Sequence, residues 1–156
     1  MLTNLNLEKK LSLGAILLLS MASCNKERNN YSYWTVDGKE YSSNKARYTS
    51  GKGGAGISTS GLSNGFSLSF KSHYPSQQGK LYLRGVENQS DYPVYNTLQF
   101  RVNGKTYMVN HDSAYIIYSI VNGQDQFVLP ETKFINYTDS LRDTVVIEAV
   151  IYKPKK

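Results

Sequence analysis

The chain has 156 residues and a formal net charge of +6, and 40% of its residues are hydrophobic and 12% are aromatic. This length and apolar content predict one folded domain rather than a disordered chain. The basic residues are scattered instead of clustered, which argues against a nucleic-acid site, and the presence of a single cysteine excludes an internal disulfide.

The N-terminal segment contains an uncharged apolar run, "LSLGAILLLSMA", from Leu11 to Ala22, directly after Lys9 and Lys10. A helix needs roughly 20 apolar residues to cross a bilayer, whereas the apolar region of a signal peptide needs only about 7 to 15. We therefore predict that residues 1–23 are a helical signal peptide and not a membrane span.

The only cysteine follows this run in the sequence "MASC", which ends at Cys24. This stretch resembles the lipobox of bacterial lipoproteins, with methionine where leucine is usual. The resemblance implies cleavage before Cys24 and lipidation of its sulfur, so that the membrane becomes a partner through a lipid anchor. Each buried methylene of such an anchor contributes about 0.8 kcal/mol to the free energy of membrane binding, so two or three acyl chains attach a protein stably to a membrane. The alternative is an unmodified thiol in a discarded leader.

Residues 24–30 are polar and predict a tether that would span about 15 Å on average. Asn25 stands where an aspartate, in enterobacterial lipoproteins, implies retention at the inner membrane, so the resemblance implies the outer membrane. Lys26 and Glu27 are similar to part of the surface-export signal of Bacteroidota-type lipoproteins, but Arg28 departs from it. Both the periplasmic and the external face of the outer membrane therefore remain open.

The rest of the chain shows short alternating runs without a helical apolar period, so residues 31–152 predict a single β domain. We interpret residues 153–156 as a solvated basic tail. Three similar turns, "TVDGKEY", "RVNGKTY" and "IVNGQDQ", contain Asp-Gly or Asn-Gly between strand formers. Because both central residues of a type I′ turn need positive φ, each turn predicts a β-hairpin.

The second turn also predicts a register. A two-residue loop pairs Val102 with Lys105 and Phe100 with Tyr107, which places the apolar partners on one face and Gln99 on the other. The core face of this hairpin is therefore predicted to be the one that carries Phe100.

The third turn pairs Tyr118 with Phe127 on one face and Ile117 with Val128 on the other. A hairpin that is apolar on both faces predicts the middle of a sheet or a covered surface. With further strands at "AGISTS", "GFSLSF", "KLYLRGV" and "TVVIEAVIY", about ten strands are predicted. This spacing favours an antiparallel all-β sandwich, with a β-barrel as the alternative.

The order of motifs resembles that of small Bacteroidota-type lipoprotein domains of unknown function. The resembling stretches are "YWTVDGKEYSS", "GISTSGLSNGFSLSF", "KLYLRG" and "LQFRVNGKTY". This family carries no assigned activity, so the resemblance implies a fold and an anchor only.

No stretch predicts a catalytic, metal or cofactor site. "GKGGAG", residues 51–56, lacks the Lys-Ser/Thr ending of a phosphate loop and predicts a mobile loop. His111 is followed by Asp112 and Ser113, but neighbours on an extended chain point to opposite faces, so a turn is expected there instead of a triad. Glu148, in an apolar strand, is expected to face solvent.

Four aromatic residues near the first hairpin are candidate ligand contacts: Tyr31, Tyr33, Trp34 and Tyr41. Their rings would suit a glycan or an envelope protein, although half-buried tyrosines are also ordinary in small sheets. We predict a non-enzymatic outer-membrane lipoprotein that acts by binding or envelope assembly. The alternatives are a lipocalin-like carrier of a small ligand and, third, a small hydrolase.

Overall fold

The structure is a computed structural model of the whole chain, and it describes residues 31–52, 54–59, 63–70, 73–87, 96–111, 113–138 and 142–155. The predicted signal peptide, the predicted tether and Cys24 lie outside the described residues. Within them the chain forms eleven strands and no helix. The all-β prediction is therefore confirmed.

The strand bounds follow the predicted runs closely. The strands are β1 (Ser32–Val36), β2 (Lys39–Ser43), β3 (Ala46–Gly51), β4 (Gly54–Thr59), β5 (Gly65–Phe70), β6 (Gly79–Tyr82), β7 (Thr97–Val102), β8 (Lys105–Val109), β9 (Tyr115–Val121), β10 (Gln124–Asn136) and β11 (Thr144–Tyr152). The strand that the sequence did not predict is β3, in which most side chains are exposed. It forms a hairpin with β4, so the mobile loop predicted for residues 51–56 is wrong for Gly51 and for residues 54–56, which are paired strand residues.

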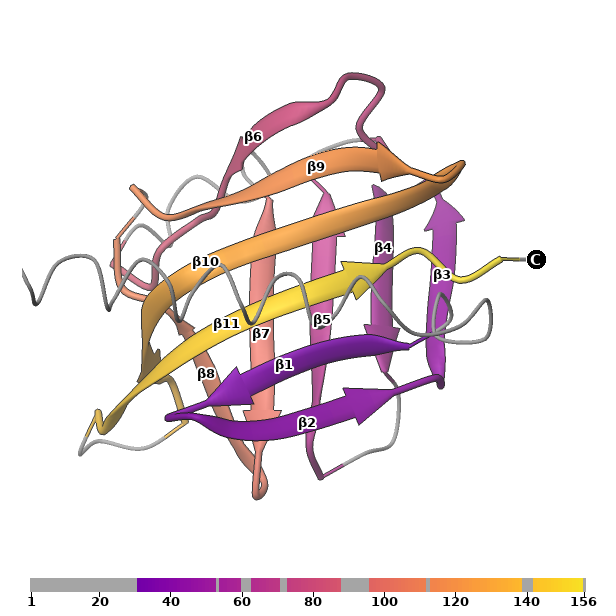
Figure 1. Cartoon of the computed structure of the whole chain (residues 1–156). Helices are drawn as coiled ribbons and strands as arrows, with labels where there is room; N and C mark the ends of the chain where they lie inside the picture. The colour runs from indigo at the N-terminus through magenta and orange to yellow at the C-terminus, as the bar shows by residue number, and fades with distance from the viewer. Residues whose placement is uncertain are drawn as a thin grey trace, which may run out of the picture.

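All strand pairs are antiparallel, and the order along the sheet is β2-β1-β11-β10-β8-β7-β5-β4-β3. Strand β9 pairs with β10, and β6 pairs with β9. Figure 1 shows two layers: a first layer of β2, β1, β11, β10, β9 and β6, and a second layer of β8, β7, β5, β4 and β3 that crosses behind it at a steep angle. One continuous sheet thus forms a nearly closed barrel whose layers pack face to face, which combines features of the predicted sandwich and its barrel alternative.

The long strand β10 connects the two layers. Its first half pairs with β9 and its last three residues pair with β8. The register against β11 shifts between Leu129 and Thr132, where Pro130 has no N–H to donate to the ladder. A bulge of this kind bends a strand and increases its twist. Strand β10 can therefore belong to the first layer at one end and meet the second layer at the other.

The three predicted hairpin turns are confirmed. The non-glycine residues Asp37, Asn103 and Asn122 have φ values of 48°, 51° and 51°, and each precedes a glycine that also has positive φ. In the second hairpin Phe100 pairs with Tyr107 and Val102 pairs with Lys105, as expected.

The interior is filled by aromatic rings that reach across from one layer to the other. Ring centroids lie 5.7 Å apart for Trp34 of β1 and Phe66 of β5, and 5.5 Å apart for Phe100 of β7 and Phe134 of β10. At the other end of the layers Phe70 of β5 lies 5.3 Å from Phe127 of β10. These contacts join the layers directly and hold the fold without a disulfide.

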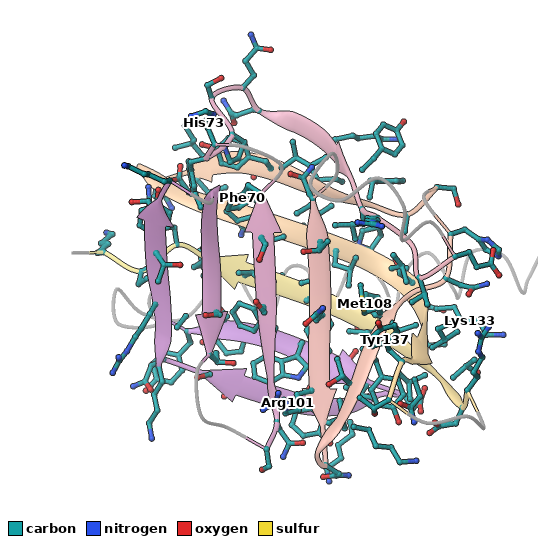
Figure 2. All side chains as sticks on the ribbon, turned by 180° about the vertical axis from the view of Figure 1, so that it is seen from behind. Phe70, His73, Arg101, Met108, Lys133 and Tyr137 are labelled. Atoms are coloured by element: carbon teal, nitrogen blue, oxygen red, sulfur yellow. The ribbon has the colours of Figure 1, made fainter. Side chains whose placement is uncertain are left out.

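The second layer has a more polar outer face, which Figure 2 shows from behind. Phe66, Leu68 and Phe70 of β5 point into the core, whereas the serines between them are half-buried on the outside. Arg101 lies near one end of this layer, and His73 lies near the other end, close to Phe70 (Figure 2). The alternation predicted for β5 is confirmed.

Candidate functional site

The four predicted aromatic residues do not form one surface. Trp34 is only 2% exposed and lies in the core with Tyr41, its partner on β2, at a ring distance of 5.8 Å. Tyr31 and Tyr33 stack on each other at 6.2 Å on the outside of the first layer. Because successive strand residues point to opposite faces, Tyr33 and Trp34 cannot share a binding surface. Of the four residues, only Tyr31 and Tyr33 lie on the outer face of the first layer.

Tyr33 belongs to a row of apolar side chains that crosses the outer face of the first layer. In register, Tyr33 of β1 lies beside Val150 of β11, Val150 beside Val128 of β10, and Val128 beside Ile117 of β9. Ile117 is 39% exposed and the other three are half-buried. We call these four residues the outer apolar row. The third hairpin lies inside the sheet, as one of its two predicted placements required, because β9 pairs with both β6 and β10, and β10 also pairs with β11.

A polar row runs beside the outer apolar row. Gln126 donates a hydrogen bond to the Tyr152 hydroxyl at 2.8 Å, and Ser119 donates one to Gln126 at 3.4 Å. Tyr115 and the exposed Tyr82 flank the apolar row on its other side, and the Lys80 ammonium lies 4.2 Å from the Tyr115 ring centroid. The outer face therefore combines apolar, aromatic and hydrogen-bonding groups, which is the composition of many recognition surfaces.

A half-buried polar cluster closes one end of the two layers around Asp125, the second residue of β10. Its carboxylate accepts hydrogen bonds from the hydroxyls of Tyr74 at 2.7 Å and Tyr118 at 2.9 Å. The Lys153 ammonium lies 3.4 Å from the same carboxylate and 4.0 Å and 4.6 Å from the ring centroids of Tyr74 and Tyr48. The cluster joins five segments of the chain. The solvated tail predicted for residues 153–156 is therefore wrong for Lys153.

The electrostatics of this cluster follow from its burial. Partial burial by itself would raise the pKa of Asp125, but the two tyrosine hydroxyls and the Lys153 ammonium outweigh it, so this pKa lies below its ordinary value. Burial and the neighbouring carboxylate raise the pKa of Tyr118 to about 12 and place the pKa of Tyr74 well above its ordinary value. Both hydroxyls remain protonated donors at neutral pH, and Asp125 remains the acceptor.

A second carboxylate, Asp143, closes the opposite end of the layers. It accepts hydrogen bonds from the Asn136 amide and the Tyr107 hydroxyl, at 2.6 Å and 2.9 Å, and pairs with Lys105 at 3.3 Å. These bonds, with that of Asn136 the largest effect, hold the pKa of Asp143 below its ordinary value. Asp143 and Asp125 thus each accept hydrogen bonds from side chains of other segments, at opposite ends of the fold.

The remaining polar candidates lie on the surface. His111 is in a bend, as expected, and its Nδ1 lies 3.0 Å from a Glu87 carboxylate oxygen, while Asn110 contacts both side chains. Glu148 is exposed, as expected, and accepts a hydrogen bond from Thr35 at 3.4 Å. Among the described residues no three His, Cys, Asp or Glu side chains converge as a metal site would require.

Comparison of the chain with protein-family models, with curated proteins and with solved structures finds no match. In the part of the chain that the structure describes, no helix is long and apolar enough to cross a membrane.

Proposed function

We propose that this protein is an outer-membrane lipoprotein, anchored through Cys24, whose β domain acts by binding or by envelope assembly. The anchor is supported by the sequence: a charged start, an apolar run of signal-peptide length and a cysteine directly after it. The polar tether then leads into Tyr31, only seven positions after Cys24. The domain is thereby held close to the bilayer.

The single observation that carries the binding role is the outer apolar row. Tyr33, Val150, Val128 and Ile117 form a continuous line over four strands, and Tyr31 stacks on Tyr33 at one end of it. A contiguous line of apolar side chains that stays partly open to solvent is a feature of interaction sites. The neighbouring hydroxyl and amide groups of Ser119, Gln126 and Tyr152 would orient a glycan or an envelope protein on this face.

The aromatic rings that fill the interior favour a surface-binding role over that of a carrier that encloses a small ligand. A carrier site is a cavity of several hundred Å³ lined by apolar side chains, whereas here rings from opposite layers meet at 5.3 to 5.7 Å along the length of the barrel. A ligand between the layers would have to displace those rings.

Labelling with radioactive palmitate in a Gram-negative host, followed by fractionation of the envelope, tests the anchor. The expected result is that the wild-type chain is labelled and is found with the outer membrane, whereas Cys24→Ala is unlabelled and is released or mislocalised, with an unchanged circular dichroism spectrum. Ser23→Ala keeps a small residue before the cysteine and serves as the matched control, which should still be labelled. Equal labelling of wild type and Cys24→Ala would contradict the proposal.

A further inference from the structure

The turn between β9 and β10 carries two adjacent exposed aliphatic side chains. Ile120 is 51% exposed and Val121 is 40% exposed, and the Asn122-Gly123 turn follows directly. The ends of hairpins are ordinarily polar, because turn residues face water. Exposing two neighbouring aliphatic side chains to water is unfavourable in free energy, unless an apolar surface covers them.

This turn lies at the same end of the first layer as the point where the chain enters the domain. In register, Ser119 of β9 lies beside Gln126 of β10, and Gln126 lies beside Tyr152 at the end of β11. Strand β1 begins at this end, next to the last residues of β11, with Tyr31 just before it. Figure 1 shows the β9–β10 turn, the start of β1 and the C-terminus on one side of the molecule.

The chain that precedes Tyr31 sets the distance of this end from the bilayer. Six residues, 25–30, separate Cys24 from Tyr31, so the chain between them can reach at most about 25 Å even when fully extended. With an anchor at Cys24, the end that bears Tyr31 cannot move far from the lipid headgroups. A short tether also raises the effective concentration of the attached surface at the membrane, so that a weak contact becomes occupied.

The composition of this end suits a bilayer interface. Ile120 and Val121 supply aliphatic surface, the 36% exposed Tyr31 supplies an amphipathic ring, and the exposed Lys155 supplies a cation for phospholipid headgroups. Aliphatic and aromatic groups that enter the boundary between headgroups and acyl chains, with lysines beside them, are typical of peripheral membrane contacts.

We propose that this end of the domain rests on the bilayer that holds the anchor, with Ile120 and Val121 in contact with lipid. The inference rests on the proposed anchor at Cys24. It sets the orientation of the domain: the first layer stands on the membrane at its β9–β10 end, and the outer apolar row, which crosses the strands from Tyr33 to Ile117, runs alongside the bilayer above that end. The opposite end of β1, with Lys39, points away from the membrane.

The test uses the full chain, processed and lipidated, in vesicles of phosphatidylethanolamine and phosphatidylglycerol that contain a nitroxide-labelled lipid. One variant, Val121→Cys, places a cysteine at the β9–β10 turn. The matched control is Lys39→Cys, because Lys39 also adjoins a two-residue turn but lies at the opposite end of β1. A lipidated Cys24 has no free thiol, so a fluorescent bimane label reports the new position alone. Incorporated palmitate is measured on the same samples.

Quenching at position 121 is expected to exceed that at position 39 by about threefold or more, because only groups within the headgroup region approach the nitroxide. Adding Ile120→Asp should reduce quenching at position 121 toward the level at position 39. Equal quenching at both positions in a palmitate-labelled chain would overturn the proposed orientation but not the anchor. The same result is expected if a protein, and not lipid, covers the β9–β10 turn. Absence of palmitate on the wild-type chain would overturn the anchor, and with it the orientation.

Discussion

Replacement of Phe100 by alanine should be among the most damaging single changes in the β domain. The side chain is 0% exposed, and its ring contacts those of Phe134, Trp34 and Phe66 at centroid distances of 5.5, 6.3 and 6.3 Å. A buried Phe→Ala change ordinarily costs about 3 to 5 kcal/mol. Each lost ring pair adds about 0.5 to 1.5 kcal/mol beyond area burial. We therefore expect a loss near the upper end, about 4 to 5 kcal/mol.

Urea unfolding followed by circular dichroism measures this loss. The midpoint should fall while the slope of the unfolding free energy against urea stays the same, because the change leaves a cavity without altering the unfolded chain. Gln99→Ala is the matched control on the adjacent residue, whose half-buried side chain faces outward and makes one weak contact with the Met108 sulfur at 3.5 Å. It should cost about 0.5 kcal/mol or less.

The comparison tests register as well as packing. A slip of one residue would exchange the faces of positions 99 and 100. If Gln99→Ala proved as destabilising as Phe100→Ala, the placement of β7 and the ring-filled interior built on it would be refuted.

Three further changes probe the turns and the closed ends. Gly104→Val should lower the free energy of unfolding in urea by about 1 to 3 kcal/mol, because φ is +82° at this position. No atom beyond the two neighbouring residues lies within 4 Å of an added Cβ, so the cost comes from the backbone conformation. A variant as stable as the wild type would contradict the type I′ turn. Lys153→Met keeps the aliphatic stem but removes the cation held by Asp125 and two tyrosine rings, and should lower the unfolding free energy by about 1 kcal/mol, whereas Lys155→Met, the control, should have no measurable effect. The lowered pKa of Asp125 predicts that its contribution to stability is present above the ordinary carboxyl pKa of about 4 and is lost as the pH falls through the lower folded value; Asp125→Asn should therefore flatten the acid side of the stability profile, and an unchanged slope would argue against the cluster.

Local sequence signals were sufficient for much of the fold. Asp37-Gly38, Asn103-Gly104 and Asn122-Gly123 each specify a turn with positive φ at both positions, and this fixes the pairing of the strands on either side. The alternation in "GFSLSF" likewise fixes which face of β5 is buried. By contrast, β3 was not predicted because it is an edge strand whose side chains are mostly exposed, so its sequence "ARYTSG" shows almost no apolar alternation.

The contacts that close the ends of the fold could not be predicted from local patterns. The Asp125 cluster joins Tyr74, Tyr118 and Lys153, and 51 positions separate Tyr74 from Asp125. Nothing near Lys153 in the sequence distinguishes it from the neighbouring tail lysines. Similarly, the aromatic residues of the first hairpin appeared to form one group in sequence, but the period of two along β1 divides them between the core and the surface.

The central claim is that Cys24 becomes the lipid-modified first residue of the mature protein. Mass spectrometry of the N-terminal peptide, from protein purified out of the membranes of expressing bacteria, tests it most directly. The account predicts a peptide that begins at Cys24 and carries a diacylglyceryl group on its sulfur, with or without an acylated amine. A mature chain that begins at any other residue, or a peptide with an unmodified Cys24, would contradict it.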